Sequence, residues 1–151
     1  MIRQINRWDY EQILDIMQAF ADATEMKGYD YDQTDRERAK KVLLRCEVGG
    51  VSLCATTDAG EIQGVILSVI DQDLWLPRVL RLREVAWWVK PEYRNTTVGA
   101  KLFHAYRQRA EQLREQGRIQ SYTISRMNFS PEFDFERRGF RHLESTYILG
   151  E

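Results

Sequence analysis

The stretch "VAWWVKPEYRNTTVGAKL", residues 85–102, changes its periodicity part-way along its length. It begins with an apolar run rich in β-forming residues, which predicts a strand that ends near Val89. It ends inside an amphipathic helix pattern over residues 96–117, whose apolar side includes Tyr106. An arginine, Arg94, and several small polar residues lie between the two, beside the free N–H groups of a helix start. This arrangement suits a bound phosphate.

The chain on either side of this stretch predicts an alternation of strands and helices. Before it we expect a strand at 1–5, a helix from an Asp9 cap to Gly28, a helix from a Thr34–Glu37 capping box to Gly49 and Gly50, and strands at 51–57, 62–70 and 80–89. After it we expect a strand at 120–127, a short helix from Ser130 and Pro131 to Gly139, and a last strand or strands at 140–150. The order predicts an α/β (α+β) sandwich with a mixed, largely antiparallel sheet.

Length and composition predict a single globular domain over residues 1–151, because 43% hydrophobic residues supply a core and no Pro- or Gly-rich linker divides the chain. No apolar run approaches the roughly 20 residues that span a bilayer, and no leader pattern opens the chain, so we expect a cytoplasmic protein that does not enter a membrane. Cys46, Cys54, His104 and His142 lack metal-ligand spacing, so we expect no metal and two reduced cysteines.

The net charge of -1 is unevenly distributed along the chain. Residues 76–118 carry ten Lys and Arg against four Asp and Glu, a net charge of +6, whereas residues 1–75 carry -6. The middle segment is therefore suited to an anion. No nucleic-acid recognition motif accompanies it and the whole chain is slightly acidic, so we expect no nucleic-acid partner.

Two motifs resemble the GNAT superfamily of acetyl-CoA-dependent N-acetyltransferases. Residues 85–102 are similar to its strand-turn-helix signature, in which an Arg or Gln is followed by x-x-G-x-G/A; Arg94 and Gly99 match, but Thr97 stands at the first glycine. The segment "NFSPEFDFERRGF", residues 128–140, resembles the family's late asparagine, short helix and closing Y-E-K-x-G-F. The element order agrees over essentially the whole chain. The resemblance implies a GNAT-like sandwich with six to seven strands and about four helices.

The resemblance also implies a binding site for acetyl-CoA at the turn. Arg94 and a run of main-chain groups would hold the pyrophosphate: Asn95, Thr96, Thr97, Val98, Gly99 and Ala100. The main chain of Trp88 and Val89 would pair with the pantetheine arm as a strand does, and Asn128 would support that arm. Read without the family, Thr96 or Thr97 caps a helix and Asn128 is a turn residue.

Glu84 is the candidate general base. It lies inside the apolar strand, and a period of two places it on the same face as Ala86 and Trp88. A carboxylate beside tryptophans is expected to have a raised pKa. The alternatives are that Glu84 forms an ion pair with Arg83, Arg81 or another surface arginine, and that water carries the proton.

The general acid is not carried over from the family, because Phe135 stands where its tyrosine stands. Tyr122 or Tyr147 would substitute, or no acid is required, since a leaving thiol with a pKa near the ~8.5 of cysteine departs readily as the thiolate. Phe135 and Thr97 both depart from the family pattern. They leave open an alternative function, in which the protein is a coenzyme-binding or protein-interaction module that has lost turnover.

The acceptor side is expected in the acidic, aromatic segment "GYDYDQTD", residues 28–35. Its candidate binding residues are Tyr29, Tyr31 and Asp32, with Asp30 and Asp35 adding negative charge that favours a cationic amine. The alternative is a solvated loop. The sequence thus predicts an N-acetyltransferase that transfers an acetyl group from acetyl-CoA to a primary amine on a small molecule or a protein. The expected long final strands and exposed aromatic residues suggest a homodimer.

Overall fold

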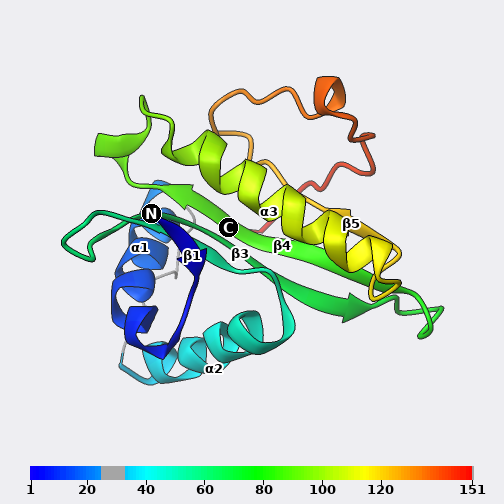
Figure 1. The fold of residues 1–151 in the computed structure, drawn as a ribbon, viewed down its shortest axis with the longest axis horizontal. Helices are drawn as coiled ribbons and strands as arrows, with labels where there is room; N and C mark the ends of the chain where they lie inside the picture. Colours follow the sequence, from blue (N-terminus) through cyan, green and yellow to red (C-terminus); the bar gives the residue numbers. More distant parts are fainter. Residues whose placement is uncertain (25–32, 151) are drawn as a thin grey trace.

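The computed structural model, which describes residues 1–24 and 33–150, contains within that part of the chain five strands in one sheet (Figure 1). The elements are β1 (Ile2–Gln4), the 3-10 helix η1 (Arg7–Asp9), α1 (Tyr10–Ala23), α2 (Gln33–Gly49), β2 (Leu53–Thr56), β3 (Ile62–Gln72), β4 (Leu80–Val89), η2 (Pro91–Tyr93), α3 (Val98–Glu115), β5 (Ser121–Thr123) and η3 (Glu136–Arg138). Neighbouring strands are antiparallel, except that β4 and β5 are parallel. The predicted α+β sandwich with a mixed, largely antiparallel sheet is confirmed.

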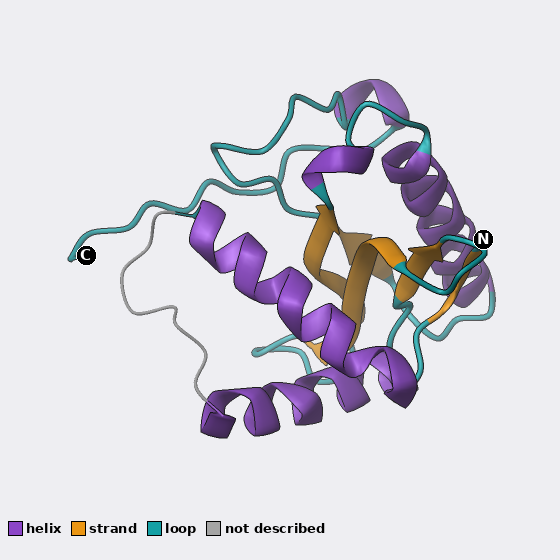
Figure 2. Ribbon diagram, turned by 90° about the vertical axis from the view of Figure 1, so that its left-hand side faces the viewer, coloured by secondary structure: helices purple, strands orange, loops and turns teal. Residues whose placement is uncertain are grey.

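Helices cover both faces of the sheet. Figure 2 shows α1 and α2 on one side and α3 on the other. Because neighbouring residues of a strand point to opposite faces, Val65 of β3 packs in the core under α1 and α2, whereas Ile66 packs with Tyr106 in the core under α3. Burial on both faces explains why β3 reads as a continuous apolar run in the sequence.

A bulge interrupts the pairing of β3 with β4. Leu67 lies opposite Ala86, but its neighbour Ser68 lies opposite Glu84, so Val85 is left without a partner on β3. A bulge of this kind inserts one residue into one strand and changes the face that the following side chains reach.

The bulge separates Glu84 from the residues with which it was expected to share a face. Ala86 and Trp88 lie in the core on the α1 side, whereas Glu84 lies opposite Ser68 and points to the α3 side. The prediction of a shared face was therefore wrong, because a strict period of two does not hold across a bulge. Glu84 instead lies on the face that α3 covers.

The sheet has fewer strands than the six to seven expected, and the described chain has three α-helices instead of about four. Residues 140–150 were expected to form a last strand or strands, but they contain none, and residues 141–150 are exposed. High β-propensity forms a strand only where a neighbouring strand and a packing surface are available. Gly28, the expected end of the first helix, lies outside the described residues.

The short helix expected after Ser130 and Pro131 is also absent; the chain makes only the 3-10 turn η3 there. Phe133 and Phe135 both pack on Phe103 of α3, with ring centroids 4.9 Å and 6.3 Å away. Residues two apart lie on different sides of an α-helix, so an extended path is required for both rings to reach Phe103. Tertiary packing has thus overridden a local helix signal.

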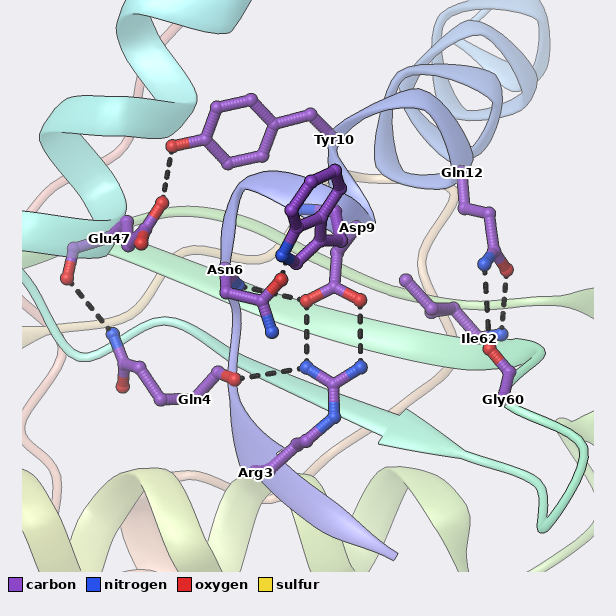
Figure 3. Close-up of polar contacts among 10 residues, drawn as sticks. Arg3, Gln4, Asn6, Asp9, Tyr10, Gln12, Glu47, Gly60 and Ile62 are labelled. Carbon is purple, nitrogen blue, oxygen red and sulfur yellow. Dashed lines mark hydrogen bonds and ion pairs between the residues drawn. The ribbon is translucent and has the colours of Figure 1, made fainter.

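Asp9 holds the N-cap position of α1, as expected, but its side chain makes no capping hydrogen bond, and Asn6 caps the preceding 3-10 turn η1. The Asn6 side chain accepts from the Trp8 N–H at 2.9 Å (Figure 3). Asp9 accepts two 2.7 Å hydrogen bonds from the Arg3 guanidinium and one of 2.8 Å from the Asn6 N–H. Burial disfavours the charge of Asp9, but these hydrogen bonds outweigh burial and hold its pKa below 3.8. Asp9 therefore ties β1 to the start of α1.

The Asp9→Asn variant should lower the free energy of unfolding by about 1–2 kcal/mol at pH 7, because it removes a charged acceptor from two strong hydrogen bonds. The folded pKa lies below the unfolded one, so this stability is present above pH 3.8 and is lost as the pH falls through the folded pKa. Urea denaturation at pH 7 and pH 3 measures it, with the difference shrinking at pH 3. Asp15→Asn, which breaks an exposed pair with Arg36, is the control and should change stability by about 0.5 kcal/mol or less.

Candidate active site

The turn between β4 and α3 presents main-chain N–H groups. α3 begins at Val98, and the Lys101 N–H donates to the Thr97 carbonyl at 2.9 Å. The N–H groups of Gly99 and Ala100 precede that bond, so no helical carbonyl is placed to accept from them. Such groups lie at the positive end of the helix dipole and bind anions. The turn is therefore suited to a phosphate.

The two threonines of the turn differ in their bonding. The Thr96 hydroxyl donates to the Tyr93 carbonyl at 2.6 Å and accepts from the Val98 N–H at 3.3 Å, which is long for such a bond. Thr97 holds the N-cap position but makes no side-chain capping bond. Helix capping thus explains Thr96 in part and does not explain Thr97.

Gly99 is not required by the packing of the protein itself. A Cβ atom built on Gly99 would lie 3.6 Å from Cγ2 of Val89, an ordinary van der Waals contact. Its backbone is not among those with positive φ. The missing side chain instead leaves the N–H groups of the turn open to close approach from outside, as a phosphate requires.

One edge of β4 is free beside this turn. β5 pairs with β4 only over Arg81, Leu82 and Arg83, and no strand of the described chain pairs with that edge from Glu84 to Val89. The opposite edge remains paired with β3 as far as Val89. An extended ligand can add to a free edge as a strand does. The free edge leads directly to the anion-binding turn.

Gly64 on β3 was not singled out from the sequence, yet it positions the end of this edge. A Cβ atom on Gly64 would lie 2.9 Å from the Trp88 carbonyl oxygen and 3.1 Å from Cα of Val89. Glycine therefore allows β3 to approach the main chain of Trp88 and Val89 closely. A glycine inside a strand is a signal of such an approach, and it is present in "IQGVILSVI".

Glu84 lies buried at the other end of the free edge. The residue is 7% exposed, and its Oε2 atom accepts from the Ser125 N–H at 3.0 Å. Burial raises the pKa of Glu84 to about 7, although the Ser125 N–H and the charge of Arg83 oppose the rise. A carboxyl group with a pKa near the working pH is well matched to general-base catalysis.

The expected alternative role of Glu84 in an ion pair is not observed. Arg83 pairs with Asp71 at 2.6 Å, and Arg81 pairs with Asp73 at 2.9 Å. Both arginines lie on the exposed side of β4, whereas Glu84 points to the buried α3 side. The carboxylate thus keeps one hydrogen bond from the main chain.

Tyr106 of α3 is a polar residue near Glu84 that the sequence placed in the apolar core. It is fully buried, and Ser68 and Glu84 lie near its hydroxyl. Burial and the nearby charge of Glu84 raise the pKa of its phenol. The sequence did not reveal that Tyr106 lies near Glu84, because a residue on the apolar face of a helix is expected only to pack in the core.

Comparison with known proteins agrees with this geometry. The model of the acetyltransferase (GNAT) family matches residues 10–140. The chain belongs to the acetyltransferase (GNAT) family. No curated protein matches its sequence.

Solved structures show how widely this acetyltransferase fold is shared. An acetyltransferase of Trypanosoma brucei is 18% identical with a TM-score of 0.70, covering 99% of this chain and 98% of its own. A possible acetyltransferase of Clostridium difficile 630 is 18% identical with a TM-score of 0.72, covering 100% and 96%. An aminoglycoside acetyltransferase from an uncultured soil metagenomic sample, in complex with sisomicin, is 16% identical with a TM-score of 0.65, covering 99% and 96%. At these identities the likeness concerns the fold.

The two tyrosines considered as the general acid differ in their surroundings. The Tyr122 hydroxyl donates to Oε1 of Glu111 at 2.6 Å, and burial, followed by that bond, raises its pKa to about 12. Tyr147 lies in the exposed segment 141–150. Phe135, at the position of the family's tyrosine, packs with Phe133, their ring centroids 4.8 Å apart.

Aromatic side chains border the α1 side of the free edge. The rings of Phe20 of α1 and Trp88 meet nearly perpendicularly, with centroids 5.3 Å apart, and the Phe129 ring centroid lies 6.3 Å from that of Phe20. Asn128 is exposed in the turn beside Phe129, where the Ser130 N–H donates to the Met127 carbonyl. The acceptor candidates Tyr29, Asp30, Tyr31 and Asp32 lie outside the described residues, while Asp35 is exposed on α2.

Residues 1–24 and 33–150 contain no group of three or more His, Cys, Asp or Glu side chains arranged to hold a metal ion. No helix in this part of the acetyltransferase combines the length and apolarity needed to cross a membrane. Cys46 and Cys54 are buried free thiols, as predicted.

Proposed function

We propose that residues 1–151 form one acetyltransferase domain that transfers an acetyl group from acetyl-CoA to a primary amine by direct attack. The observation that carries the proposal is the free edge of β4, which joins a buried carboxylate with a pKa of about 7 to an anion-binding helix start. A structural role alone explains neither the unpaired edge nor the buried, singly bonded Glu84.

The residues of the turn fit the coenzyme. The N–H groups of Gly99 and Ala100 and the guanidinium of Arg94 would hold the pyrophosphate, with Asn95, Thr96, Thr97 and Val98 around it. Trp88 and Val89 would pair with the pantetheine arm through their main chain. Asn128, exposed beyond the free edge, would contact the same arm. When bound, acetyl-CoA supplies a thioester whose carbonyl carbon accepts an amine.

Glu84 would take a proton from the acceptor ammonium before attack, or from the amine nitrogen as it attacks, directly or through one water molecule. Its carboxylate form is favoured above its pKa of about 7, so proton removal becomes efficient as the pH rises through that value. Main-chain N–H groups near Trp88 and Val89 would stabilise the carbonyl oxygen as it gains charge. No acid from this chain is required, because a thiolate departs readily at neutral pH.

The proposed acceptor carries positive charge and is a small molecule or a lysine-like amine. The fold accommodates polycationic acceptors, since an aminoglycoside acetyltransferase of the same fold is known in complex with sisomicin. The aromatic border formed by Phe20, Trp88 and Phe129 adds surfaces that attract cations. Action in the cytoplasm, as a homodimer, without nucleic acid, remains our prediction.

The Gly99→Trp variant tests the proposal. Thiol release from acetyl-CoA should appear with one class among polyamines, aminoglycosides, amino acids and peptides. It should be lost in Gly99→Trp, because an indole would fill the space before the N–H groups and weaken coenzyme binding at least about tenfold, or 1.4 kcal/mol. Coenzyme A should also raise the unfolding temperature of the wild type and not that of the variant.

Gly99→Ala is the matched control, because its Cβ makes only an ordinary contact with Val89; it should stay folded and keep much of the binding. Equal coenzyme binding by Gly99→Trp and the wild type would contradict the site. Tight binding without turnover on any amine would favour the alternative function, a coenzyme-binding or interaction module that has lost catalysis.

A further inference from the structure

Arg94, which the proposed function assigns to the pyrophosphate, lies elsewhere in this structure. Its guanidinium carbon is 4.3 Å from the centroid of the Trp88 ring, and its Nε atom donates to the Val89 carbonyl at 3.0 Å. None of the ion pairs within the described part of the chain includes Arg94. Arg94 therefore covers both the ring and the end of the free edge.

The indole ring of Trp88 has a face on which a cation can bind. Trp88 is 9% exposed, and Phe20 meets its ring nearly perpendicularly, with an interplanar angle of 82°. The indole N–H has no partner within residues 1–24 and 33–150. With Phe20 against the ring, Arg94 occupies a face that attracts cations through the electron-rich centre of the indole.

To bind a pyrophosphate, Arg94 would leave the Trp88 ring and the Val89 carbonyl, because its guanidinium nitrogens would turn to paired, charge-assisted hydrogen bonds with the phosphate oxygens. Such bonds are stronger than an exposed cation–π contact and a neutral hydrogen bond. Bound coenzyme would thus draw Arg94 away and uncover the main chain that its own arm needs, together with the face of Trp88.

We propose that the face of Trp88 is a subsite for a cationic group of the acceptor, which Arg94 occupies until the coenzyme is bound. The attacking amine must be neutral, so the group on the ring is a second ammonium or guanidinium of the same molecule. The acceptor class is therefore a di- or polycation. This inference rests on the proposed function for the role of the coenzyme, but the competition between Arg94 and a cation concerns this chain alone.

Calorimetric titration with agmatine, which carries an amine and a guanidinium, tests the inference without turnover. Wild-type protein should bind agmatine about tenfold more tightly when saturated with coenzyme A than without it. By linkage, agmatine should tighten coenzyme A binding by the same factor. In Arg94→Ala, agmatine should bind without coenzyme as tightly as it binds the saturated wild type, and the coupling should disappear.

Removing Arg94 also removes one positive charge, which could by itself favour agmatine binding. Variants of Trp88 distinguish this effect from binding of agmatine to the ring. In the Arg94→Ala background, Trp88→Phe should bind agmatine more weakly and Trp88→Leu more weakly still, because the attraction follows the ring. Trp88→Phe preserves packing if the leucine variant does not fold. Arg7→Ala is the matched control: Arg7 lies 4.6 Å over the exposed Trp8 ring, and its removal should change neither affinity nor coupling.

The inference is overturned if Arg94→Ala binds agmatine no more tightly than the wild type without coenzyme, or if Trp88→Phe and Trp88→Leu bind as tightly as Trp88. Neither result depends on thiol release from acetyl-CoA. Acetyl transfer to a monoamine would therefore remain possible even if the Trp88 subsite were disproved. Failure of coenzyme A to bind would instead contradict the proposed function, while the comparison of coenzyme-free proteins would still decide the subsite.

Discussion

Replacing Glu84 with glutamine is expected to lower kcat by about two to four orders of magnitude, the usual cost of removing a general base. Glutamine is nearly isosteric and retains an oxygen that accepts from the Ser125 N–H, so the local structure is preserved. It cannot take a proton at any working pH. The wild-type rate should rise with pH through about 7, the pKa of the buried carboxyl, and that rise should be absent from the residual activity of the variant.

The same substitution should stabilise the protein at pH 8. The unfolded chain releases the Glu84 proton near pH 4.5, whereas the folded protein releases it near pH 7. Between these values the folded state holds the additional proton, so the free energy of unfolding falls as the pH rises and the loss is complete above pH 7. Glutamine removes this buried charge, and the gain of the variant should vanish below pH 4.5.

Urea denaturation at pH 4 and pH 8, beside a pH–rate profile, checks both effects. Glu61→Gln is the control, because Glu61 is an exposed carboxylate paired with Lys90 at 2.8 Å near the other end of β4. It should change neither the rate nor the pH dependence. An active Glu84→Gln enzyme with an unchanged profile would assign proton transfer to water and leave Glu84 without a catalytic role.

Gly50→Ala is expected to lower the free energy of unfolding by about 3 kcal/mol, and the unfolding temperature by roughly 6–12 °C. A Cβ atom there would overlap the Ser68 carbonyl oxygen and lie 2.7 Å from its carbon. Ser68 cannot yield easily, since its hydroxyl donates to the Val51 carbonyl at 2.6 Å and its N–H donates to the Ser52 hydroxyl at 3.0 Å. Thermal unfolding measures the loss.

Gly49→Ala is the matched control one residue earlier, because a Cβ atom on Gly49 meets nothing within 4 Å. It should leave stability nearly unchanged. Ser68 lies opposite Glu84, so residual folded Gly50→Ala protein should also show a displaced pH–rate profile. Equal stabilities for the two alanine variants would show that the junction of α2 and β2 relaxes around the added methyl group.

The strand-turn-helix at residues 85–102 could be predicted because its signals are local. The apolar run, Pro91 and the amphipathic pattern specify a strand, a turn and a helix without reference to the rest of the chain, and all three form. The free N–H groups follow from the helix start alone. The turn that we propose to bind the coenzyme could therefore be found from the sequence, even though Thr97 replaces the expected glycine.

The surroundings of Glu84 could not be predicted because they depend on two strands together. "LREVAWWV" reads as regular alternation, and the bulge at Val85 exists only in the register against Ser68. The buried neighbour Tyr106 comes from a helix farther along the chain. The helix predicted after Ser130 failed for the same reason: the long-range packing of Phe133 on Phe103 outweighs the local preference for a helix.

The short outer strands bear on how this protein behaves at high concentration. β1 and β5 contribute three residues each, so they offer little template for another chain to extend the sheet. The free edge of β4 from Glu84 to Val89 is the exception, because alternate residues there direct main-chain groups away from β3, where a stray strand could match them. A ligand bound along this edge would prevent such pairing, so the solubility of the protein should rise with the fraction of molecules that have ligand bound there.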